Sequence, residues 1–540
     1  MKGMTMCLML LLAGIVYAQN EEWIARYEPG STAEAIAVDY AGNVYISGYG
    51  HGVGTSIDYI TIKYDSAGDT LWVRYYDSGD SVYDYARSLA IDDAGNIYVT
   101  GRSITFGNNV DIATIKYNST GEEQWVARYD GGGDDEGYDV AVDAVGNVYV
   151  TGVTSINRGA HFITIKYDSS GDTVWTARYG GPDGAGCIAY ALALDGAGNV
   201  YVTGEGYSST TASDYATVKY DASGNEEWAA TYDGLVAYAA DVAYDLVCKD
   251  GYVYVTGESE NASYDPDYFT IKYTSTGDTV WTARYDGPGN AFDIAHALDV
   301  DGDGYVYVTG ESFGTYTSVD YTTIKYNSTG GIEWTARYNG PDSASDQAYA
   351  VAFDDDGNVY VTGRSYAYEP YTPEYDYLTV KYNSSGVEQW NARYDGTGHT
   401  QDEALAIAVD NVGFVYVTGG STGNTSYEDF LTIKYSTTGV EEVTRADQPM
   451  LRLSVHPNPF SKLTLVSFCM ERSAERTELK IFNAAGQLVR SFDPLPYAPS
   501  PVQVSWDGTD QANQRLSSGV YFVRLEAGDI YKIEKLLLIK

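Results

Sequence analysis

The sequence predicts an all-β protein made of repeated units, followed by a smaller and separate β domain. Three observations lead to this prediction. The heptapeptide GNVYVTG or a near copy starts eight times, at Gly42, Gly95, Gly146, Gly198, Gly251, Gly304, Gly357 and Gly413. TIKY or TVKY also ends eight times, at steps of 50 to 56 residues, from Tyr64 to Tyr435. After Arg445 the repeat stops, and proline, arginine and leucine become more frequent. Regular repeats of this length indicate one supersecondary unit copied many times.

Each unit carries four short runs that are typical of β-strands. In the second unit these runs are SLAID, NIYVT, ATIKY and QWVAR. They alternate with period two and are rich in β-branched and aromatic residues, which favours strands over helices. The connectors DDAGN and NSTGE place Asp or Asn first and Gly three residues later, which favours tight turns. Each unit is therefore predicted to be a four-stranded antiparallel meander.

A single sheet of this kind cannot bury both faces, but copies stacked around an axis can. That arrangement is the β-propeller, and eight units predict eight blades. A linear solenoid is the alternative, but it needs polar capping repeats at its ends. The first and last copies look like the inner ones, so the sequence favours the propeller.

The N-terminal stretch EEWIARY, residues 21–27, matches the fourth run of the repeat although no unit precedes it. The eighth copy has three runs and is followed by VEEVTRA, which lacks the expected Trp and Tyr. We therefore expect Trp23 and Tyr27 to belong to the outer strand of the eighth blade, so that the N-terminal strand closes the ring.

The first 18 residues have the pattern of a secretory signal peptide: Lys2, an apolar stretch from Met4 to Val16, and a small residue at Ala18. The predicted organisation is then a signal peptide at 1–18, a propeller at 19–445, a linker at 446–454 and a C-terminal domain at 455–540. No other stretch is long enough to predict a transmembrane segment.

The formal net charge of −42 argues against nucleic acid or an anionic lipid surface as a general partner. Outside the signal peptide, the cysteines are Cys187, Cys248 and Cys469. Their number is odd and their repeat positions differ, so a disulfide framework is not predicted.

The repeat also carries a family resemblance. AVDYAGNVYISG from Ala37 and AVDAVGNVYVTG from Ala141 fit the pattern A-x-D-x-x-G-N-x-Y-V-T-G. In this respect the chain resembles the bacterial β-propeller repeat family, often called seven-bladed, over residues 21–445. Eight copies imply eight blades in this chain, whatever the family name suggests.

The C-terminal segment contains six strand-like runs, from LTLVSF to KIEKLLLI, which predict a small β-sandwich. It resembles the C-terminal sorting domains of type IX secretion substrates and the Ig-like domain of flagellar hook-capping proteins. The resemblance is carried by Pro457 to Phe460, IFNAAGQLVR, WDGTD at 506–510 and SSGVYFVRL. It implies passage through a Gram-negative outer membrane, with release or attachment outside. A structural domain without a sorting role is the alternative.

The connections between second and third strands vary in sequence, as in RSITFGNNVD and ESENASYDPD. Strand alternation places them on one face of the ring, opposite the glycine turns, and variable loops on a rigid scaffold are common binding sites. The repeated tryptophans, from Trp72 to Trp390, are better explained by packing between blades than by sugar binding.

Five carboxylates stand eight residues before the turn Asp, at Asp84, Asp135, Asp293, Asp346 and Asp402. They are expected near the channel rim of the loop face. One interpretation is a cation site at the channel mouth, and the other is hydrogen bonding to loop backbone where the strand begins.

DVDGDG at 299–304 matches the first half of a calcium loop, with Asp299, Asp301 and Asp303 as oxygen donors. The second half fails, since Gly310 stands where a bidentate Glu belongs, and the segment also aligns as an ordinary repeat turn. Calcium is therefore only a possible ligand, and no other cofactor is predicted. His51, His161, His296 and His399 lack a recognisable nucleophile or metal-spaced partner, which favours scattered surface histidines.

These patterns favour an exported, non-catalytic scaffold, secreted or at the cell surface of a Gram-negative-type bacterium. Its predicted partners are an extracellular protein or polysaccharide, bound at the variable-loop face, and a secretion machinery that reads the C-terminal domain. The alternatives are a secreted polysaccharide-degrading enzyme with its site in the propeller funnel, and a structural surface-layer component. No catalytic residues are assigned.

Overall fold

The computed structural model divides the chain into two compact units, residues 1–441 and 442–540. No helix in the described ranges is long and apolar enough to cross a membrane. The structure describes residues 21–28, 30–52, 57–79, 83–105, 109–156, 159–181, 184–208, 212–234, 236, 238–340, 343–368, 373–396, 400–423, 428–436, 451–456, 462–470, 477–483, 487–492, 502–512, 514–527 and 530–539. The predicted signal peptide, the VEEVTRA segment and Pro457 to Phe460 lie outside these ranges.

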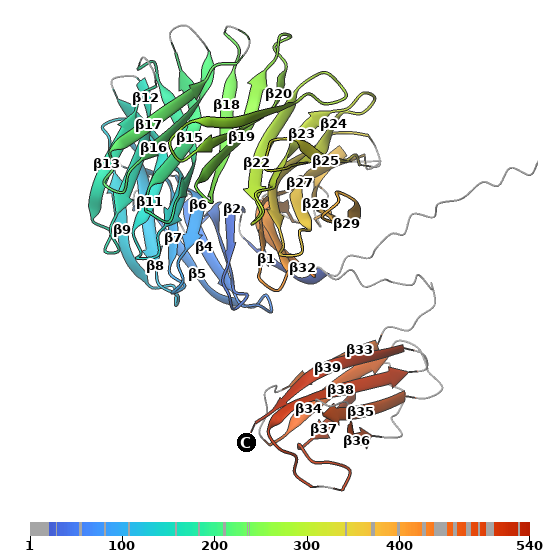
Figure 1. Cartoon of the computed structure of the whole chain (residues 1–540). Helices are drawn as coiled ribbons and strands as arrows, with labels where there is room; N and C mark the ends of the chain where they lie inside the picture. Colours follow the sequence, from blue (N-terminus) through green and yellow to red (C-terminus); the bar gives the residue numbers. More distant parts are fainter. Residues whose placement is uncertain are drawn as a thin grey trace, which may run out of the picture. The chain divides into compact units, whose positions relative to one another are not determined.

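The predicted all-β class is confirmed, because the described residues of the first unit form four-stranded antiparallel sheets (Figure 1). In seven sheets, the strands pair in chain order. The first three are β2 (Ser31–Val38), β3 (Val44–Gly50), β4 (Asp58–Tyr64), β5 (Thr70–Tyr76); β6 (Asp84–Ile91), β7 (Ile97–Thr105), β8 (Asn109–Tyr117), β9 (Glu123–Tyr129); and β10 (Asp135–Val142), β11 (Val148–Ile156), β12 (Gly159–Tyr167), β13 (Thr173–Tyr179).

The next four sheets repeat this order. They are β14 (Cys187–Leu194), β15 (Val200–Tyr207), β16 (Ser213–Tyr220), β17 (Glu226–Tyr232); β18 (Asp241–Lys249), β19 (Tyr252–Glu260), β20 (Pro266–Thr274), β21 (Thr279–Tyr285); β22 (Asp293–Val300), β23 (Val306–Phe313), β24 (Val319–Tyr326), β25 (Ile332–Tyr338); and β26 (Asp346–Phe353), β27 (Val359–Tyr368), β28 (Pro373–Tyr382), β29 (Glu388–Tyr394).

The remaining sheet of this unit joins the two ends of the repeat region. Its strand order is β1 (Glu21–Tyr27), β32 (Glu428–Tyr435), β31 (Val415–Thr422) and β30 (Asp402–Val409). β1 runs antiparallel to β32, with Trp23 opposite Lys434 and Tyr27 opposite Phe430. The N-terminal strand thus occupies the sheet position that a fourth strand occupies elsewhere.

The first turn of each repeat is fixed by its aspartate. Asp39 Oδ1 accepts hydrogen bonds from the backbone N–H groups of Ala41 and Asn43, both at 2.9 Å. Its Oδ2 accepts bonds from the Asn43 amide and from the hydroxyl of buried Tyr45. Gly42 takes a φ of +76°, which an L side chain rarely adopts. These bonds explain why the residues D-x-x-G-N-x-Y recur together.

The repeated tryptophans pack on the turn of the next sheet. A Cβ on Gly121 would lie 2.7 Å from the Trp72 ring, so only glycine leaves room for the indole. The Trp72 indole N–H also donates to the Ser119 carbonyl at 3.4 Å. In the last sheet, Trp23 makes the same contacts, with its ring against Gly68 and its N–H on the Ser66 carbonyl at 3.2 Å. The ladder is therefore structural.

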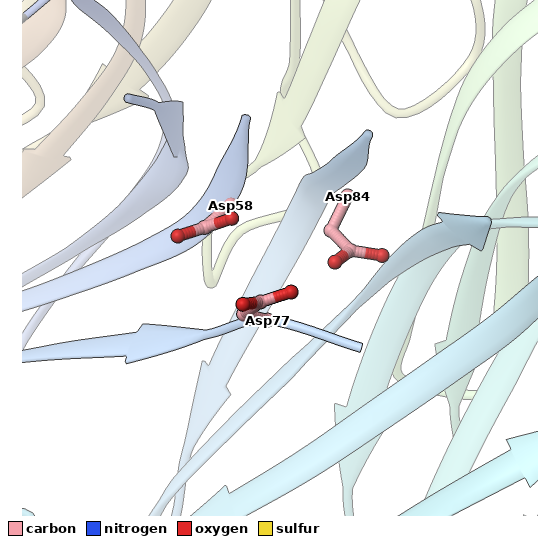
Figure 2. A group of neighbouring side chains, drawn as sticks. All are labelled: Asp58, Asp77 and Asp84. Carbon is pink, nitrogen blue, oxygen red and sulfur yellow. The ribbon is translucent and has the colours of Figure 1, made fainter. Parts of the chain in front are cut away.

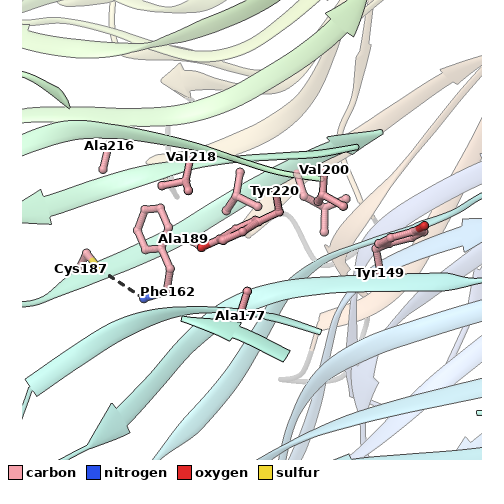
Figure 3. Close-up of a cluster of buried hydrophobic side chains, with 11 residues drawn as sticks. Tyr149, Phe162, Ala177, Cys187, Ala189, Val200, Ala216, Val218 and Tyr220 are labelled. Atoms are coloured by element: carbon pink, nitrogen blue, oxygen red, sulfur yellow. Dashed lines mark hydrogen bonds between the residues drawn. The ribbon is translucent and has the colours of Figure 1, made fainter. Parts of the chain in front are cut away.

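Buried side chains fill the spaces between neighbouring sheets. Figure 3 shows the cluster between the β10–β13 and β14–β17 sheets, where Tyr149 and Phe162 of one sheet pack against Val200, Val218 and other residues of the next. The described residues form eight such clusters in this unit, each between two sheets. One of them joins Ala33 and Ile46 of the first sheet to Tyr416 and Phe430 of the last.

The second unit contains two sheets. One has the order β33 (Leu451–His456), β34 (Thr464–Met470), β37 (Val502–Trp506); the other has the order β36 (Leu488–Phe492), β35 (Thr477–Asn483), β38 (Gly519–Ala527), β39 (Ile530–Leu538). Trp506, Leu479 and Leu525 lie in its buried core. β33 starts inside the segment predicted as a linker, because Leu451 to His456 pair along β34.

Candidate functional site

The first strand of every sheet in the first unit has a β-bulge at the same position. In β6 the pairing shifts between Ala86 and Ser88, so Arg87 is an extra residue without a partner on β7. A bulge re-aims the extra side chain, and bulges are common next to functional sites. The eight extra residues, here called the axial ring, are Glu34, Arg87, Tyr138, Tyr190, Tyr244, His296, Tyr349 and Leu405.

The first strands of the eight sheets, which carry these extra residues, lie next to one another. First strands of neighbouring sheets contact one another at all eight junctions, including β2 with β30. Among the described residues, no two fourth strands of neighbouring sheets make contacts as extensive as these. The first strands are therefore nearest to the axis, and the extra residues of their bulges lie around it.

The glycine of the repeated TG pair makes the bulge possible. A Cβ on Gly257 would lie 1.9 Å from the carbonyl oxygen of Val242, on the strand that carries Tyr244. The equivalent carbonyl would lie 2.0 Å from a Cβ on Gly48 or Gly310. The TG glycine therefore allows close approach of two backbones, which the sequence patterns did not reveal.

Five consecutive members of the axial ring form an aromatic arc. Ring centroids are 5.8 Å apart between Tyr138 and Tyr190, and 6.0 Å between Tyr190 and Tyr244. The arc continues through His296 at 6.0 Å to Tyr349 at 5.7 Å. All five side chains are half-buried, so each one keeps some surface exposed.

Three glutamates on the neighbouring second strands contact this arc. The hydroxyls of Tyr190 and Tyr244 donate to Glu205 and Glu258, at 2.7 and 2.9 Å. His296 Nε2 lies 3.7 Å from Glu311 Oε1. His296 is thus part of a cluster, so the interpretation of it as a scattered surface histidine is wrong, while His399 lies outside the described residues.

Arginines neutralise the carboxylates on the other side of the ring. Arg87 lies 3.7 Å from Glu34 and 3.1 Å from Glu136. Arg364 pairs with Glu403 at 2.9 Å. The ring therefore has one sector with arginine–glutamate pairs and another in which tyrosines contact glutamates.

The glutamates of the aromatic sector have different acidities. Burial raises the pKa of Glu258, although the Tyr244 hydroxyl and His296 partly oppose the rise. Burial also disfavours the charged form of Glu311, but the nearby His296 and a hydrogen bond from the Gln347 side chain outweigh it and lower the pKa of Glu311. Neighbouring carboxyl groups with shifts of opposite sign are a feature of binding and catalytic sites.

The five predicted rim carboxylates are fully buried where first strands begin. Asp84 Oδ2 accepts a hydrogen bond from the backbone N–H of Ser78 at 2.9 Å. Asp402 accepts bonds from the N–H groups of Gly396 and Thr422, at 2.6 and 2.9 Å. Asp135, Asp293 and Asp346 bond loop N–H groups in the same way. This geometry matches the interpretation in which they hold the loop backbone.

Several of these aspartates also lie in carboxylate groups that could hold a metal ion. In Figure 2, Asp58, Asp77 and Asp84 point toward one another, and one oxygen of each lies within 4.8 Å of the others. The other such groups among the described residues are Asp111, Asp130, Asp135; Asp214, Asp233, Asp241; Asp267, Asp286, Asp293; and Glu374, Asp376, Asp395. In three of the five, an arginine pairs with a member at 2.8 to 3.0 Å.

The predicted calcium-loop residues have separate surroundings. Asp301 accepts bonds from the backbone N–H groups of Asp303 and Tyr305 and from the Tyr307 hydroxyl, as the turn aspartates of other repeats do. Asp299 lies in β22 and accepts a bond from the Val300 N–H. These bonds are those of an ordinary repeat turn.

Burial of several carboxyl groups predicts that stability depends on pH. Burial raises the pKa of Asp139 to about 6 and that of Asp245 to about 7. A carboxyl group whose pKa is raised in the folded state contributes stability that is fully present below its pKa in the unfolded chain. This stability is lost as the pH rises through the folded-state pKa values of about 6 to 7. Hydrogen bonding outweighs burial and lowers the pKa of turn aspartates such as Asp39 and Asp92, whose contribution is lost only in strong acid.

We therefore expect the highest melting temperature near pH 5, with a fall of several degrees by pH 8 and another fall below pH 3.5. Scanning calorimetry across this range measures the effect. The variant Asp245→Asn should flatten the alkaline side, since each unit of pKa shift corresponds to about 1.4 kcal/mol. A melting temperature that rises steadily from pH 5 to pH 8 would contradict the assignment.

Comparisons with known proteins agree with this architecture. The family described as Beta-propeller repeat matches residues 71–106, 124–159 and 333–369. The FlgD Ig-like domain family matches residues 460–529. These matches cover parts of the repeat region and most of the C-terminal domain. Each propeller match runs from a tryptophan strand through the first two strands of the next sheet.

Individual relatives are more distant. WD repeat-containing protein L264 of Acanthamoeba polyphaga mimivirus is 24% identical over 446 residues, which is 66% of this chain and 31% of the relative. The match therefore spans about a third of the relative's length.

The solved structures that match this chain share little sequence with it. The WD40 domain of SCAP from fission yeast is 9% identical, with a TM-score of 0.37, over 78% of this chain and 98% of that domain. Drosophila Plexin A, solved in complex with Semaphorin 1b, is 9% identical with a TM-score of 0.35, over 78% of this chain and 88% of its own. Scores this low say nothing about the ligand.

Proposed function

We propose that this protein is an exported, non-catalytic binding scaffold, in which eight blades form a propeller that β1 closes. Its ligand is an extracellular protein or polysaccharide, bound at the loop face and the axial ring. The C-terminal domain directs secretion or surface attachment in a Gram-negative-type bacterium, as its type IX sorting resemblance implies.

One observation carries this proposal. The bulge position is built identically in all eight sheets, yet it holds glutamate, arginine, tyrosine, histidine and leucine. The surrounding scaffold repeats almost without change, whereas the ring residues differ from sheet to sheet. A rigid scaffold with varied side chains around one axis is the usual design of a binding surface.

A binding screen tests the proposal. The chain from residue 19 to residue 540 would be applied to glycan and extracellular-protein arrays, with and without calcium. We expect specific binding that is reduced at least tenfold when Tyr190 and Tyr349 are both changed to Ala. A parallel arm in which a chelator replaces calcium shows whether the aspartate groups contribute to binding.

Other outcomes would favour the rival functions. The pKa values of Glu258 and Glu311 are shifted in opposite directions, as acid–base catalysis requires of its carboxyl groups, so turnover of a glycan in the screen would overturn the non-catalytic proposal. Ordered self-assembly of the purified chain without any ligand would favour a surface-layer component instead.

A further inference from the structure

We propose that the aromatic sector of the axial ring binds a protonated amine, supplied by a small polyamine or by a lysine side chain of a partner protein. The proposed site consists of four residues of this sector, Tyr190, Tyr244, Glu205 and Glu258. The inference rests on the proposed function only in taking the axial ring to be a ligand-binding surface.

The first argument comes from one repeat position, the residue that follows the TG glycine. This position holds arginine in two sheets, at Arg102 and Arg364. It holds glutamate in three consecutive sheets, at Glu205, Glu258 and Glu311. The backbone position is equivalent, so the sign of the charge beside the ring is reversed in the three middle sheets.

The two arginines at this position lie close to tyrosine rings. The Arg102 guanidinium lies over the Tyr85 ring, 4.3 Å from its centroid. The Arg364 guanidinium lies 5.7 Å from the centroid of Tyr349, a member of the axial ring. Tyrosine faces attract cations at such distances. In the sheets of Tyr190 and Tyr244, the chain supplies a carboxylate where those sheets supply their own cation.

The second argument concerns charge. In the described ranges, no lysine or arginine forms an ion pair with Glu205 or Glu258, and their hydrogen bonds come from neutral tyrosine hydroxyls. Glu205 is only 8% exposed, so water compensates its charge poorly. Glu34, in contrast, lies beside Arg87. A cation is therefore the missing partner of this sector.

An ammonium group fits both features. Its three N–H donors can bond carboxylate oxygens, and its charge interacts favourably with tyrosine faces. A carboxylate has room for several donors, so the tyrosine hydroxyl and an ammonium can bind the same glutamate. An anionic ligand would be repelled here, and a neutral sugar would leave the charge without a counterion.

Titration calorimetry with spermidine, on the chain from residue 19 to residue 540, tests this proposal. We expect one saturable site, and a loss of affinity of about tenfold or more in Glu258→Gln, which keeps the side-chain shape. Glu403→Gln is the matched control, because burial also raises the pKa of Glu403, but this carboxylate is not a member of the axial ring and already pairs with Arg364. Its affinity should stay within twofold of the parent.

A second variant, Glu205→Gln, keeps the test valid if Glu258→Gln does not fold. A trilysine peptide titrated in parallel separates the two sources of the amine: binding of spermidine alone indicates a small polyamine, and binding of both indicates a lysine side chain as well.

Two results would overturn the inference. One is the absence of saturable spermidine binding. The other is equal binding by the parent and both glutamine variants, since a chain with a net charge of −42 attracts polyamines without a specific site. Loop-face binding in the array screen would be unaffected by either result, so the proposed function would stand while this inference failed.

Discussion

A chain that starts at residue 28 is expected to melt about 10 °C below one that starts at residue 19. Removal of β1 exposes the backbone edge of β32 and takes away the Trp23 ring that packs on Gly68. It also breaks the ion pair between Arg26 and buried Asp429, at 3.0 Å, which leaves a buried carboxylate without its cation. Losses of this kind cost several kcal/mol each, which corresponds to a large shift in melting temperature.

Circular dichroism melting of the two chains measures this difference. A chain that starts at residue 21 is the matched control, because it keeps the whole of β1 and loses only two residues. Equal melting temperatures for the chains starting at 19 and 28 would show that β1 does not hold the sheets together.

Gly257→Ala is expected to be the most damaging single substitution of those considered. The new Cβ would lie 1.9 Å from the Val242 carbonyl oxygen, a distance that no side-chain rotation relieves. The backbone at the Tyr244 bulge would have to move, which we expect to cost about 3 kcal/mol or more. The variant should melt several degrees lower and should also bind spermidine more weakly.

Gly302→Ala is the control for this substitution. Gly302 lies in an exposed turn, and a Cβ there would meet nothing within 4 Å. Its melting temperature should equal that of the parent or slightly exceed it, since alanine restricts the unfolded chain. If Gly257→Ala proved equally mild, the account of the TG glycine would be wrong.

Much of the fold could be predicted because the same local sequence pattern recurs in all eight repeats. Asp39 and Gly42 predict the turn, and strand alternation predicts the meander, so eight copies remove most of the ambiguity of a single copy. The missing tryptophan of the last copy and the extra one at Trp23 are enough to predict where β1 pairs. The limits of the C-terminal domain were harder to predict, because its strands are short and do not repeat.

The candidate site was much harder to predict. A bulge is a shift in pairing between strands, and residues such as Ala86 and Ser88 carry no local signal of it. The TG glycine was visible as a repeated residue, but its role depends on a carbonyl from another strand. One signal was available: in A-x-A contexts such as those around Glu34 and His296, a single variable and bulky position lies among constant alanines.

Backbone amide hydrogen exchange of the chain from residue 19 to residue 540 probes the pairing of β1 with β32 without any substitution. If β1 completes the last sheet, the amides of residues 21–27 should be protected as strongly as those of β17 and β21, which are fourth strands of interior sheets. Rapid exchange at residues 21–27, with β32 still protected, would contradict the closure of the ring by the N-terminal strand.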